Sequence, residues 1–448
     1  MTDWSQKVTP FIETAAATLG RKLSIQKIQR LSGGAINQNF LVELSDHEGT
    51  LLKWVLRRGQ SLPIPGSLDR ASEYAMVTHA DAIGMTVAKP VALVNQPQAS
   101  ASIFQWCEGQ TEGRTLLAQL AASPPDAIRG LAQSLGAELG RLHGQASSTQ
   151  AGKVLAGVLG KRPGCGFSAS IDLLTKSFAR VKAPKRYLTE AFQHCVRESE
   201  QVFKARGNAS EPACVSHNDF RLGNLMIEPK TTRLTAVLDW EFTAWGDPLA
   251  DIGWLTAPCW RFGGREIVAG FGEVEDLLAG YESATEDAAV HQRLKERVAQ
   301  ELDFWQRYAH LRWAIIAAQQ GERAVSGDSE ALELLLTGAM VASILEPTLG
   351  YYWGDVPKTT LQSPGGIESE LDRLLAEAGL HLKAHLALHL SGPQRYSALM
   401  SANAIRLARG GLRLAQPNLV ASITSDSEKT MLAKKELAAD LAVWNFRG

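Results

Sequence analysis

The sequence predicts an α+β protein in which a small antiparallel sheet near the N-terminus is followed by a mainly helical chain. Three observations lead to this prediction. Short strand-like runs separated by turn residues fill residues 21–106, and amphipathic helical patterns dominate the chain that follows. The turn-rich stretch GDVPKTTLQSPGG then separates a further set of helical patterns, so we expect an extra helical domain at the C-terminus.

The N-terminal region predicts a small sheet with helices beside it. Residues 1–20 have the pattern of a short amphipathic helix. Three strand-like runs follow, namely LSIQKIQRL, NFLVEL and TLLKWVLRR, and turn residues separate them, so we expect an antiparallel meander. Residues 69–83 carry apolar positions at helical spacing, and VAKPVALV and ASIFQW supply two further strands. We therefore predict about five strands, with one helix inserted after the third strand.

Helical patterns dominate the rest of the chain, with the stretch 214–240 as the exception. They are clear in PPDAIRGLAQSLGAELGRLHGQ and at 183–205 and 290–320. Beyond the turn-rich stretch, three more helices are expected at 366–390, 393–416 and 427–445. The predicted domain boundaries enclose residues 1–106, 107–355 and 360–448.

The composition excludes several classes of protein. The chain has 448 residues, of which 45% are apolar and 21% charged, and its net charge of −1 gives no basic excess for binding nucleic acid. Its five cysteines are scattered without a C-x-x-C pair, which argues against a disulfide framework and a zinc site. The N-terminus lacks an apolar signal core, and the longest apolar runs are shorter than a membrane span. We therefore expect a cytoplasmic protein without a nucleic-acid or membrane partner.

Hydrogen-bonding side chains are concentrated in SHNDFRLGN, at 216–224, and in LDWE, which contains Asp239. LMIE and LTAVLD are strand-like and flank a turn at Lys230–Arg233, so the stretch predicts an antiparallel hairpin. The midpoint between Asn224 and Asp239 lies in that turn, so we expect the two residues to face each other at the open end of the hairpin. An amide oxygen and a carboxylate that lie so close to each other are suitable ligands for Mg²⁺.

Asp219 lies on the loop that enters this hairpin. A carboxylate in that place can accept the proton of a hydroxyl group that attacks a phosphate, or can orient that hydroxyl. His217 is expected to brace the loop by hydrogen bonding. Asn and Asp are also common in turns and helix caps, but the matching position of Asp239 favours a functional site over that alternative.

The spacing of His217, Asp219 and Asn224, with the later Asp239, resembles the catalytic motifs of the aminoglycoside phosphotransferase and choline-kinase-like superfamily. The stretch LDWEFTAWGDPLADIGWL is similar to the bacterial and acyl-CoA-dehydrogenase-linked branch of that superfamily. The resemblance covers residues 20–355 and implies a bilobal fold like that of protein kinases. It implies that Asp219 is the catalytic aspartate and that Asn224 and Asp239 hold Mg²⁺.

The same resemblance assigns nucleotide binding to the N-terminal lobe, residues 1–106, and catalysis and acceptor binding to residues 107–355. GGAINQNF looks like the phosphate-loop region of the branch, which implies that ATP contacts Ser32, Gly33 and Gly34. WVLR matches the cation-bearing third strand and indicates Arg57 as the phosphate contact, with Lys53 as the alternative.

Three further residues are expected around the nucleotide. Glu73 lies on the helix that follows the third strand and is the expected ion-pair partner of Arg57. Phe104 and Trp106 end the last strand of the predicted sheet and resemble the hinge that lies beside adenine. A solvated helix charge is the alternative for Glu73.

Other charged residues near the motif leave alternatives open. Asp247 precedes a proline, as is typical of a helix N-cap, and we expect Asp251 to brace the loop. Glu241 either lies behind the metal site or is an exposed strand-end charge. Arg261 or Arg265 either contacts an anionic substrate or belongs to a surface loop.

The resemblance implies ATP- and Mg²⁺-dependent phosphorylation of a hydroxyl group on a small molecule. The acceptor is expected to be a hydroxy acid or hydroxyacyl thioester, as the branch implies, or an aminoglycoside-like antibiotic. A catalytically silent nucleotide-binding regulator or scaffold is the alternative function. The C-terminal helices are expected to form a homodimer interface or to cover the acceptor cleft.

Overall fold

The protein is described here by a computed structural model. The structure describes residues 4–31, 37–59, 64–96, 99–144, 150–207, 209–285, 287–324, 331–357, 367–414 and 426–445. Its contacts divide the chain into two compact units. Unit 1 comprises Met1–Leu173 and Val202–Ala309, and unit 2 comprises Leu174–Gln201 and His310–Gly448. The division into a nucleotide-binding, a catalytic and a C-terminal region stays a prediction.

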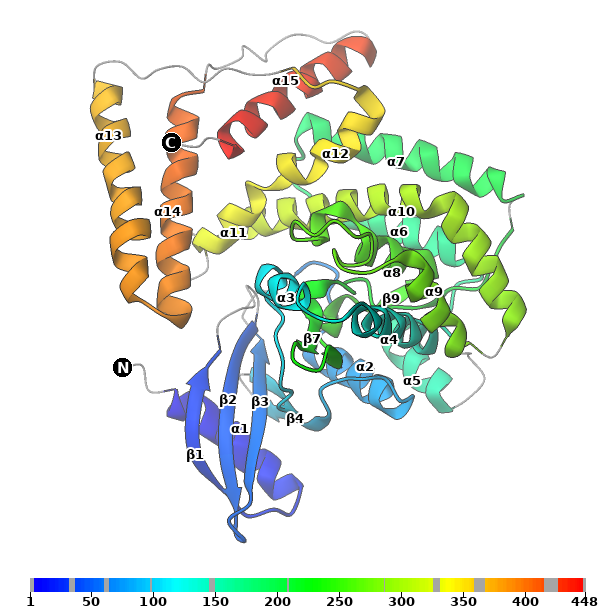
Figure 1. The fold of residues 1–448 in the computed structure, drawn as a ribbon, viewed down its shortest axis with the longest axis vertical. Coiled ribbons are helices and arrows are strands. Elements are labelled where there is room, and N and C mark those ends of the chain that lie inside the picture. The colour runs from blue at the N-terminus through cyan, green and yellow to red at the C-terminus, as the bar shows by residue number, and fades with distance from the viewer. Residues whose placement is uncertain are drawn as a thin grey trace. The chain divides into compact units, whose positions relative to one another are not determined.

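A five-stranded sheet opens unit 1, as the sequence predicts (Figure 1). Its strands are β1 (Leu23–Arg30), β2 (Asn37–Asp46), β3 (Leu51–Gly59), β4 (Pro90–Gln96) and β5 (Ala99–Gln105). The spatial order is β1-β2-β3-β5-β4, and every neighbouring pair is antiparallel. Helix α2 (Arg70–Ala82) follows the third strand and begins with an N-cap at Asp69, whose side chain accepts from the backbone N–H of Ser72.

One face of the sheet is the core of this region because apolar residues alternate along its strands. Phe40, Val42 and Leu44 on β2 are fully buried, and helix α1 (Ser5–Thr18) packs against this face with Phe11 and Ile12. Burial of each such side chain contributes about 1.5–3 kcal/mol. The opposite face of β3 is therefore left to carry polar side chains.

The rest of unit 1 is mainly helical. Its helices are α3 (Gly113–Leu120), α4 (Pro125–His143), α5 (Gln150–Leu159), the first part of α6 (Gly166–Phe178), the end of α7 (Arg186–Ala205), α8 (Pro248–Thr256), α9 (Val274–Ser283) and the first part of α10 (Ala288–Arg323). Two pairs of short strands lie among them: β6 (Cys214–Ser216) with β9 (Ala244–Gly246), and β7 (Leu225–Glu228) with β8 (Arg233–Val237).

Helices α4 and α9 approach closely because glycine lies at their contact. A Cβ atom at Gly136 would lie 1.8 Å from the carbonyl oxygen of Leu277, and one at Gly280 would lie 1.8 Å from that of Gln133. No other residue type could occupy either position without moving the two helices apart.

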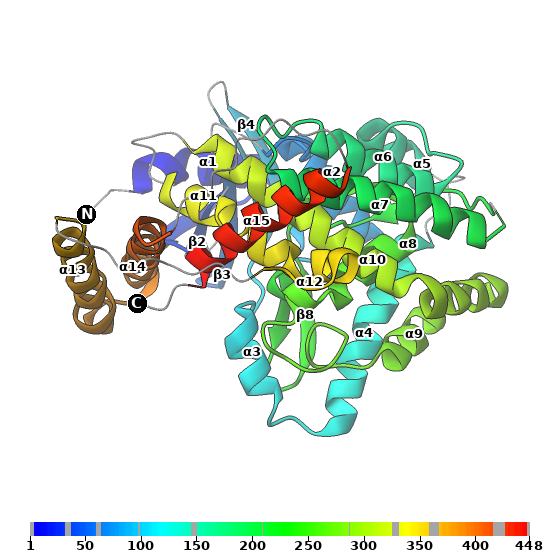
Figure 2. The ribbon, with the colours of Figure 1, turned by 90° about the horizontal axis from the view of Figure 1, so that it is seen from above.

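Unit 2 contains α11 (Ala331–Gly338), α12 (Val341–Trp353), α13 (Ile367–Leu380), α14 (Gly392–Leu412) and α15 (Asp426–Trp444), with the remaining parts of α6, α7 and α10. The three helices expected after residue 360 are thus present. Helices α13 and α14 lie side by side in both views (Figure 1 and Figure 2). The buried carboxylate of Asp372 joins them, since it accepts hydrogen bonds from Arg409 and Arg413.

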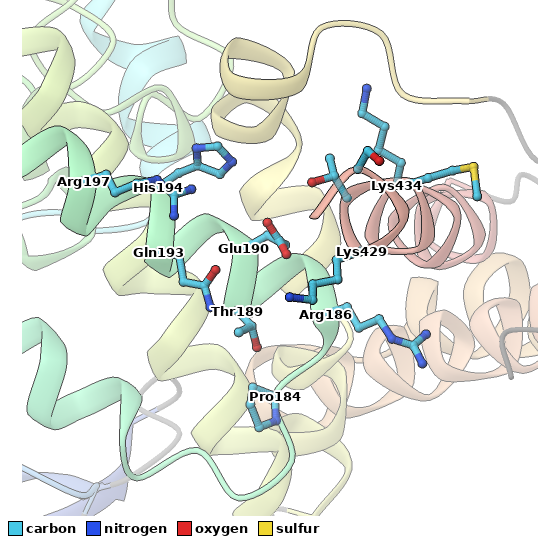
Figure 3. A pocket seen from close by; sticks show the side chains of 12 residues that line it. Pro184, Arg186, Thr189, Glu190, Gln193, His194, Arg197, Lys429 and Lys434 are labelled. Atoms are coloured by element: carbon cyan, nitrogen blue, oxygen red, sulfur yellow. The ribbon is translucent and has the colours of Figure 1, made fainter. Parts of the chain in front are cut away.

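Helices α7 and α15 line a cavity of about 1110 Å³ in unit 2. Its wall includes four basic side chains, Arg186, Arg197, Lys429 and Lys434 (Figure 3).

Residues Ala331–Trp353 are long and apolar enough to cross a membrane by length and composition alone, a pattern that core helices share, and 39% of their most apolar window is buried. The predicted homodimer and the predicted lack of a membrane partner stay predictions.

Candidate functional site

A cleft of about 360 Å³ lies in unit 1 between the sheet and the β7–β8 hairpin. Strands β3 and β5 and helix α2 line one side, and the loop at 221–224 and the hairpin line the other. The cleft brings together six residues that the sequence analysis selected: Arg57, Glu73, Phe104, Trp106, Asn224 and Asp239. Their positions span more than a third of the chain, so only the fold unites them.

One end of the cleft is apolar. Phe104 at the end of β5 and Trp106 just beyond it line this end, together with Val55 on β3 and Met226 on β7. Phe104 is 8% exposed, and its ring lies 5.8 Å from that of Tyr74. Apolar and aromatic side chains of this kind suit a planar aromatic ring.

The polar end of the cleft is organised around Arg57. Its Nη2 atom lies 3.2 Å from Oε1 of Glu73 and also forms an ion pair with Asp239. The predicted Arg57–Glu73 ion pair is therefore confirmed, and Glu73 is held in turn by Arg70 at 2.5 Å. Burial disfavours the charged guanidinium, but the carboxylates of Asp239 and Glu73 outweigh it and raise the pKa of Arg57.

The structure distinguishes Arg57 from its alternative, Lys53. Lys53 lies four residues earlier on β3, does not line the cleft, and its ammonium group lies 3.6 Å from a carboxylate oxygen of the exposed Glu108. Of the two cations considered on this strand, Arg57 alone faces the cleft.

Asp251 on α8 holds the loop that carries Asp219 through hydrogen bonds to its backbone. The two carboxylate oxygens of Asp251 accept the backbone N–H of His217 at 2.8 Å and that of Asn218 at 2.7 Å. Asn218 has a φ of 61°, a left-handed conformation that these bonds help to hold. Burial disfavours the charged form of Asp251, but hydrogen bonding to His143 outweighs it and keeps the pKa of Asp251 below its ordinary value.

His217 braces the same loop, as the sequence predicts. The backbone N–H of Asp219 donates to Nδ1 of His217 at 3.2 Å. Burial of the imidazole lowers the pKa of His217, so the ring is neutral at pH 7 and its Nδ1 can act as an acceptor. Asp247 is the N-cap of α8, also as predicted, because its carboxylate accepts from the backbone N–H of Leu249.

The Asp219 carboxylate is buried and held by three donors. Oδ1 accepts from Nε of Arg221 and from Nε1 of Trp254, both at 3.0 Å. Oδ2 accepts from Nδ2 of Asn224 at 2.6 Å. Each carboxylate oxygen can accept two hydrogen bonds, so Oδ2 retains an acceptor position for a further group.

Asn224 and Asp239 both line the cleft, but they do not face each other directly as predicted. Leu225 pairs with Val237, and the backbone N–H of Leu238 donates to the carbonyl of Asn224, so Leu238 is the residue opposite Asn224. An irregularity between Met226 and Ile227 shifts the register along the hairpin. Asp239 lies one residue farther on, where a φ of 68° redirects the chain.

The oxygen atoms of Asn224 and Asp239 fit a hard divalent cation. Nδ2 of Asn224 donates to the carbonyl and the carboxylate of Asp219, so these two acceptors fix the amide and leave its oxygen for a ligand. Burial disfavours the charged form of Asp239, but Arg57 outweighs it and lowers the pKa of Asp239, which keeps this group an anion. Within the described part of the chain, no group of three or more His, Cys, Asp or Glu side chains is placed to hold a metal ion.

Two residues beside Asp219 were missed by the sequence analysis. The guanidinium of Arg221 lines the cleft and lies 4.5 Å from the ring centroid of Trp260, besides its bond to Asp219. Trp254 reaches the same carboxylate from α8. Arg221 lies within the motif and was open to prediction, whereas no local signal links Trp254 or Trp260 to a loop so distant in the sequence.

The remaining candidates have mixed outcomes. Glu241 is 5% exposed, so it is not an exposed charge, and burial followed by the charge of Asp239 raises the pKa of Glu241 to about 8. The guanidinium of Arg261 donates twice to the carbonyl of Thr256, and Arg265 is exposed. The predicted phosphate-loop residues, Ser32, Gly33 and Gly34, lie outside the described residues.

Comparison with known proteins finds one matching family and several partial relatives. The profile of the phosphotransferase enzyme family matches residues 27–296. Acyl-CoA dehydrogenase family member 11 of Mus musculus is 38% identical over 58 residues, which is 13% of this chain and 7% of that protein. Acyl-CoA dehydrogenase family member 10 of Mus musculus is 25% identical over 131 residues, which is 29% of this chain and 12% of that protein. The matches thus span only a small part of the length of these curated relatives.

A solved structure shares the fold. A Ralstonia eutropha protein classed as an aminoglycoside phosphotransferase superposes with a TM-score of 0.51 at 19% identity, over 77% of this chain and 97% of that one. Plasmodium vivax ethanolamine kinase gives a TM-score of 0.46 at 15% identity, over 72% of this chain and 80% of that one. The predicted kinase-like bilobal fold, with an antiparallel sheet and a mainly helical remainder, is confirmed.

Proposed function

The chain belongs to the phosphotransferase enzyme family, and from that premise we propose that it uses ATP and Mg²⁺ to phosphorylate a hydroxyl group of a small molecule. One observation supports this proposal above the others. A single cleft joins a cation on the sheet, Arg57, to an amide and a carboxylate at the hairpin, Asn224 and Asp239. Phosphoryl transfer needs such an assembly, because its catalysis depends on positioning and on balancing charge.

In this proposal ATP lies along the cleft. Phe104 and Trp106 take the adenine ring at the apolar end, and Arg57 contacts the phosphates at the polar end. Glu73 holds Arg57 by the ion pair described above, so the guanidinium stays aimed into the cleft. Ser32, Gly33 and Gly34, which lie between β1 and β2 in the sequence, contact the phosphates, a role that rests on the sequence alone.

Asn224 and Asp239 would hold Mg²⁺. The Asn224 amide oxygen is left for the ion because its Nδ2 donates to Asp219, and the Asp239 carboxylate lines the cleft beside Arg57. The ion, when bound, offsets the negative charge of the phosphates.

Asp219 receives the acceptor in this proposal. Its carboxylate orients the hydroxyl group and takes its proton, as the hydroxyl oxygen forms a bond to the γ-phosphorus. The bond from that phosphorus to the bridging oxygen breaks, and ADP leaves with the electron pair. Trp254 and Arg221 occupy both acceptor positions of Oδ1, which leaves Oδ2, with one donor, to accept the proton of the hydroxyl.

The surroundings of Asp219 favour an anionic acceptor such as a hydroxy acid or hydroxyacyl thioester. The side chain of Arg221 is bonded to Asp219 and remains 24% exposed, so a positive charge lies beside the place where the acceptor must enter. A polycationic antibiotic would meet repulsion there. The partial likeness to acyl-CoA dehydrogenase family members also supports an acyl-type acceptor.

A metabolite screen tests this function. The purified protein is incubated with ATP, MgCl₂ and pools of hydroxy acids, hydroxyacyl thioesters and aminoglycosides, and each pool is searched by mass spectrometry for the gain of one phosphoryl group. We expect a phosphorylated product among the anionic acceptors that requires both ATP and Mg²⁺. If the protein binds ATP but none of the pools yields a phosphorylated product, the result favours the catalytically silent regulator.

A further inference from the structure

Asn39 and Arg57 are direct neighbours across two strands. β2 and β3 pair antiparallel, and in their register Asn39 is the partner of Arg57. Directly opposed residues have Cβ atoms roughly 4.5–5.5 Å apart and point to the same face of a sheet. Both residues line the cleft, so both side chains lie on the face that the proposed nucleotide occupies.

Each of these side chains has a buried atom without a hydrogen-bond partner in the described part of the chain. On Asn39 it is the amide oxygen, Oδ1, and on Arg57 it is the inner guanidinium nitrogen, Nε. One atom is an acceptor and the other a donor, so they are chemically complementary. Buried polar groups are seldom left unpaired in a folded protein, and here an unpaired donor and an unpaired acceptor lie on neighbouring strands of one face.

The ion pairs of the Arg57 guanidinium explain why its Nε does not donate to Oδ1 of Asn39 in this structure. Nη2 is directed to Asp239 and Glu73, and these ion pairs set the orientation of the planar guanidinium. A phosphate in the cleft would offer Arg57 a different anionic partner. A guanidinium that turns from Asp239 to a phosphate must also turn its Nε–H, since the group is rigid and planar.

We propose that Asn39 is the positioning residue for Arg57, an inference that rests on the proposed function. When the guanidinium moves from Asp239 to the nucleotide phosphates, Oδ1 of Asn39 accepts the Nε–H of Arg57 and holds the fork in place. The same movement releases the carboxylate of Asp239. Asn39 thus acts through Arg57 and does not itself contact the nucleotide.

A double-mutant cycle on nucleotide binding tests this role. Asn39→Leu removes the acceptor and keeps a branched side chain of four heavy atoms, and Asn39→Ala is a second, smaller variant in case the first does not fold. Arg57→Lys keeps the charge but has no donor at the Nε position. The dissociation constants of ATP and of adenosine are measured by titration calorimetry for the wild type, each single variant and each double variant. The matched control is Gln38→Ala, because Gln38 neighbours Asn39 on β2 and pairs with Arg58.

We expect Asn39→Leu to weaken ATP binding about tenfold, as for one hydrogen bond to a charged group. In the Arg57→Lys background the same change should alter ATP binding by less than about twofold, because the coupled donor is gone. Adenosine, which lacks phosphates, should bind all variants of Asn39 equally, and Gln38→Ala should bind ATP like the wild type.

Other results would overturn the inference. Equal losses in the wild-type and Arg57→Lys backgrounds would show that Asn39 does not act through the arginine, and weaker adenosine binding would show a direct nucleoside contact. A wild-type protein that binds no ATP would overturn the proposed function itself, whereas ATP binding without coupling between the two residues overturns only the positioning role.

Discussion

The amide nitrogen of Asn224 donates to the carboxylate of Asp219 at 2.6 Å and to the backbone carbonyl of the same residue at 2.9 Å. These two bonds give Asn224 a double task. Its nitrogen fixes the proposed catalytic carboxylate, and its oxygen is thereby turned to the place proposed for Mg²⁺. Loss of this side chain should therefore disturb proton acceptance and metal binding together.

Asn224→Ala should lower the rate of phosphoryl transfer by roughly 10²-fold and raise the Mg²⁺ concentration needed for half-maximal rate about tenfold. The measurement is ADP formation over a range of MgCl₂ at saturating ATP. An unchanged Mg²⁺ requirement, with a protein that unfolds at the wild-type temperature, would show that the amide oxygen is not a metal ligand.

The loop beneath Asp219 should depend on Asp251. Asp251→Asn keeps the shape of the side chain but replaces one carboxylate oxygen with an NH₂ group. This donor would then face the backbone N–H of His217 or Asn218, which is also a donor. We expect a loss of about 3 kcal/mol in the free energy of unfolding, because a buried donor loses its charged partner.

Asp126→Asn is the control for this prediction, since Asp126 forms an exposed ion pair with Arg129 on α4. It should change stability by less than about 0.5 kcal/mol. Urea unfolding, followed by tryptophan fluorescence, compares the two variants with the wild type. Similar small effects from both substitutions would contradict the structural role of Asp251.

Two glycines on α4 should respond oppositely to the same substitution. Gly136→Ala places a Cβ atom against the backbone of Leu277 and should destabilise the protein by about 1–3 kcal/mol. Gly130→Ala meets nothing within 4 Å and should be neutral or stabilise by up to about 1 kcal/mol. Thermal unfolding of the two variants tests this difference, and equal midpoints would refute the close approach of α4 and α9.

The pairing of Asp372 with two arginines predicts a pH dependence of stability in the C-terminal helices. Hydrogen bonds from Arg413 and then Arg409 lower the pKa of Asp372 below its ordinary value of 3.8. The unfolded chain therefore takes up a proton at higher pH than the folded protein. The stabilisation is present above pH 3.8 and is lost as the pH falls through the lower folded value.

Asp372→Asn should consequently be less stable than the wild type by a constant amount at about pH 5–7, and the difference should shrink below pH 3.8. The unfolding midpoints of both proteins are measured at each pH. The contributions of all other titrating groups cancel in the difference between the two proteins. A difference that does not change with pH would mean that Asp372 is not an ion-pair partner.

Local patterns sufficed to predict much of this molecule. Alternation along β3 placed Arg57 on a polar face, and the spacing from His217 to Asn224 identified the loop that carries Asp219. These features depend on residues close in sequence, so a single segment contains the information.

Features that arise from irregular or long-range geometry could not be predicted. The irregularity that places Leu238 opposite Asn224 has no sequence signature in the hairpin. The ion pair between Arg57 and Asp239 joins residues 182 positions apart, and it becomes visible only when the sheet and the hairpin are assembled. For the same physical reason the contact of Trp254 with Asp219 was not foreseen.

The proposed function requires Asp219 to receive the acceptor hydroxyl beside a cleft that binds ATP independently of it. Asp219→Asn tests this claim most directly, with ATP affinity and phosphoryl transfer measured on the same preparation. We expect an ATP dissociation constant within about threefold of the wild type and a transfer rate lower by roughly 10²–10⁴-fold. A variant that retains most of its transfer rate, or that loses ATP binding together with transfer, would show that Asp219 does not have this role.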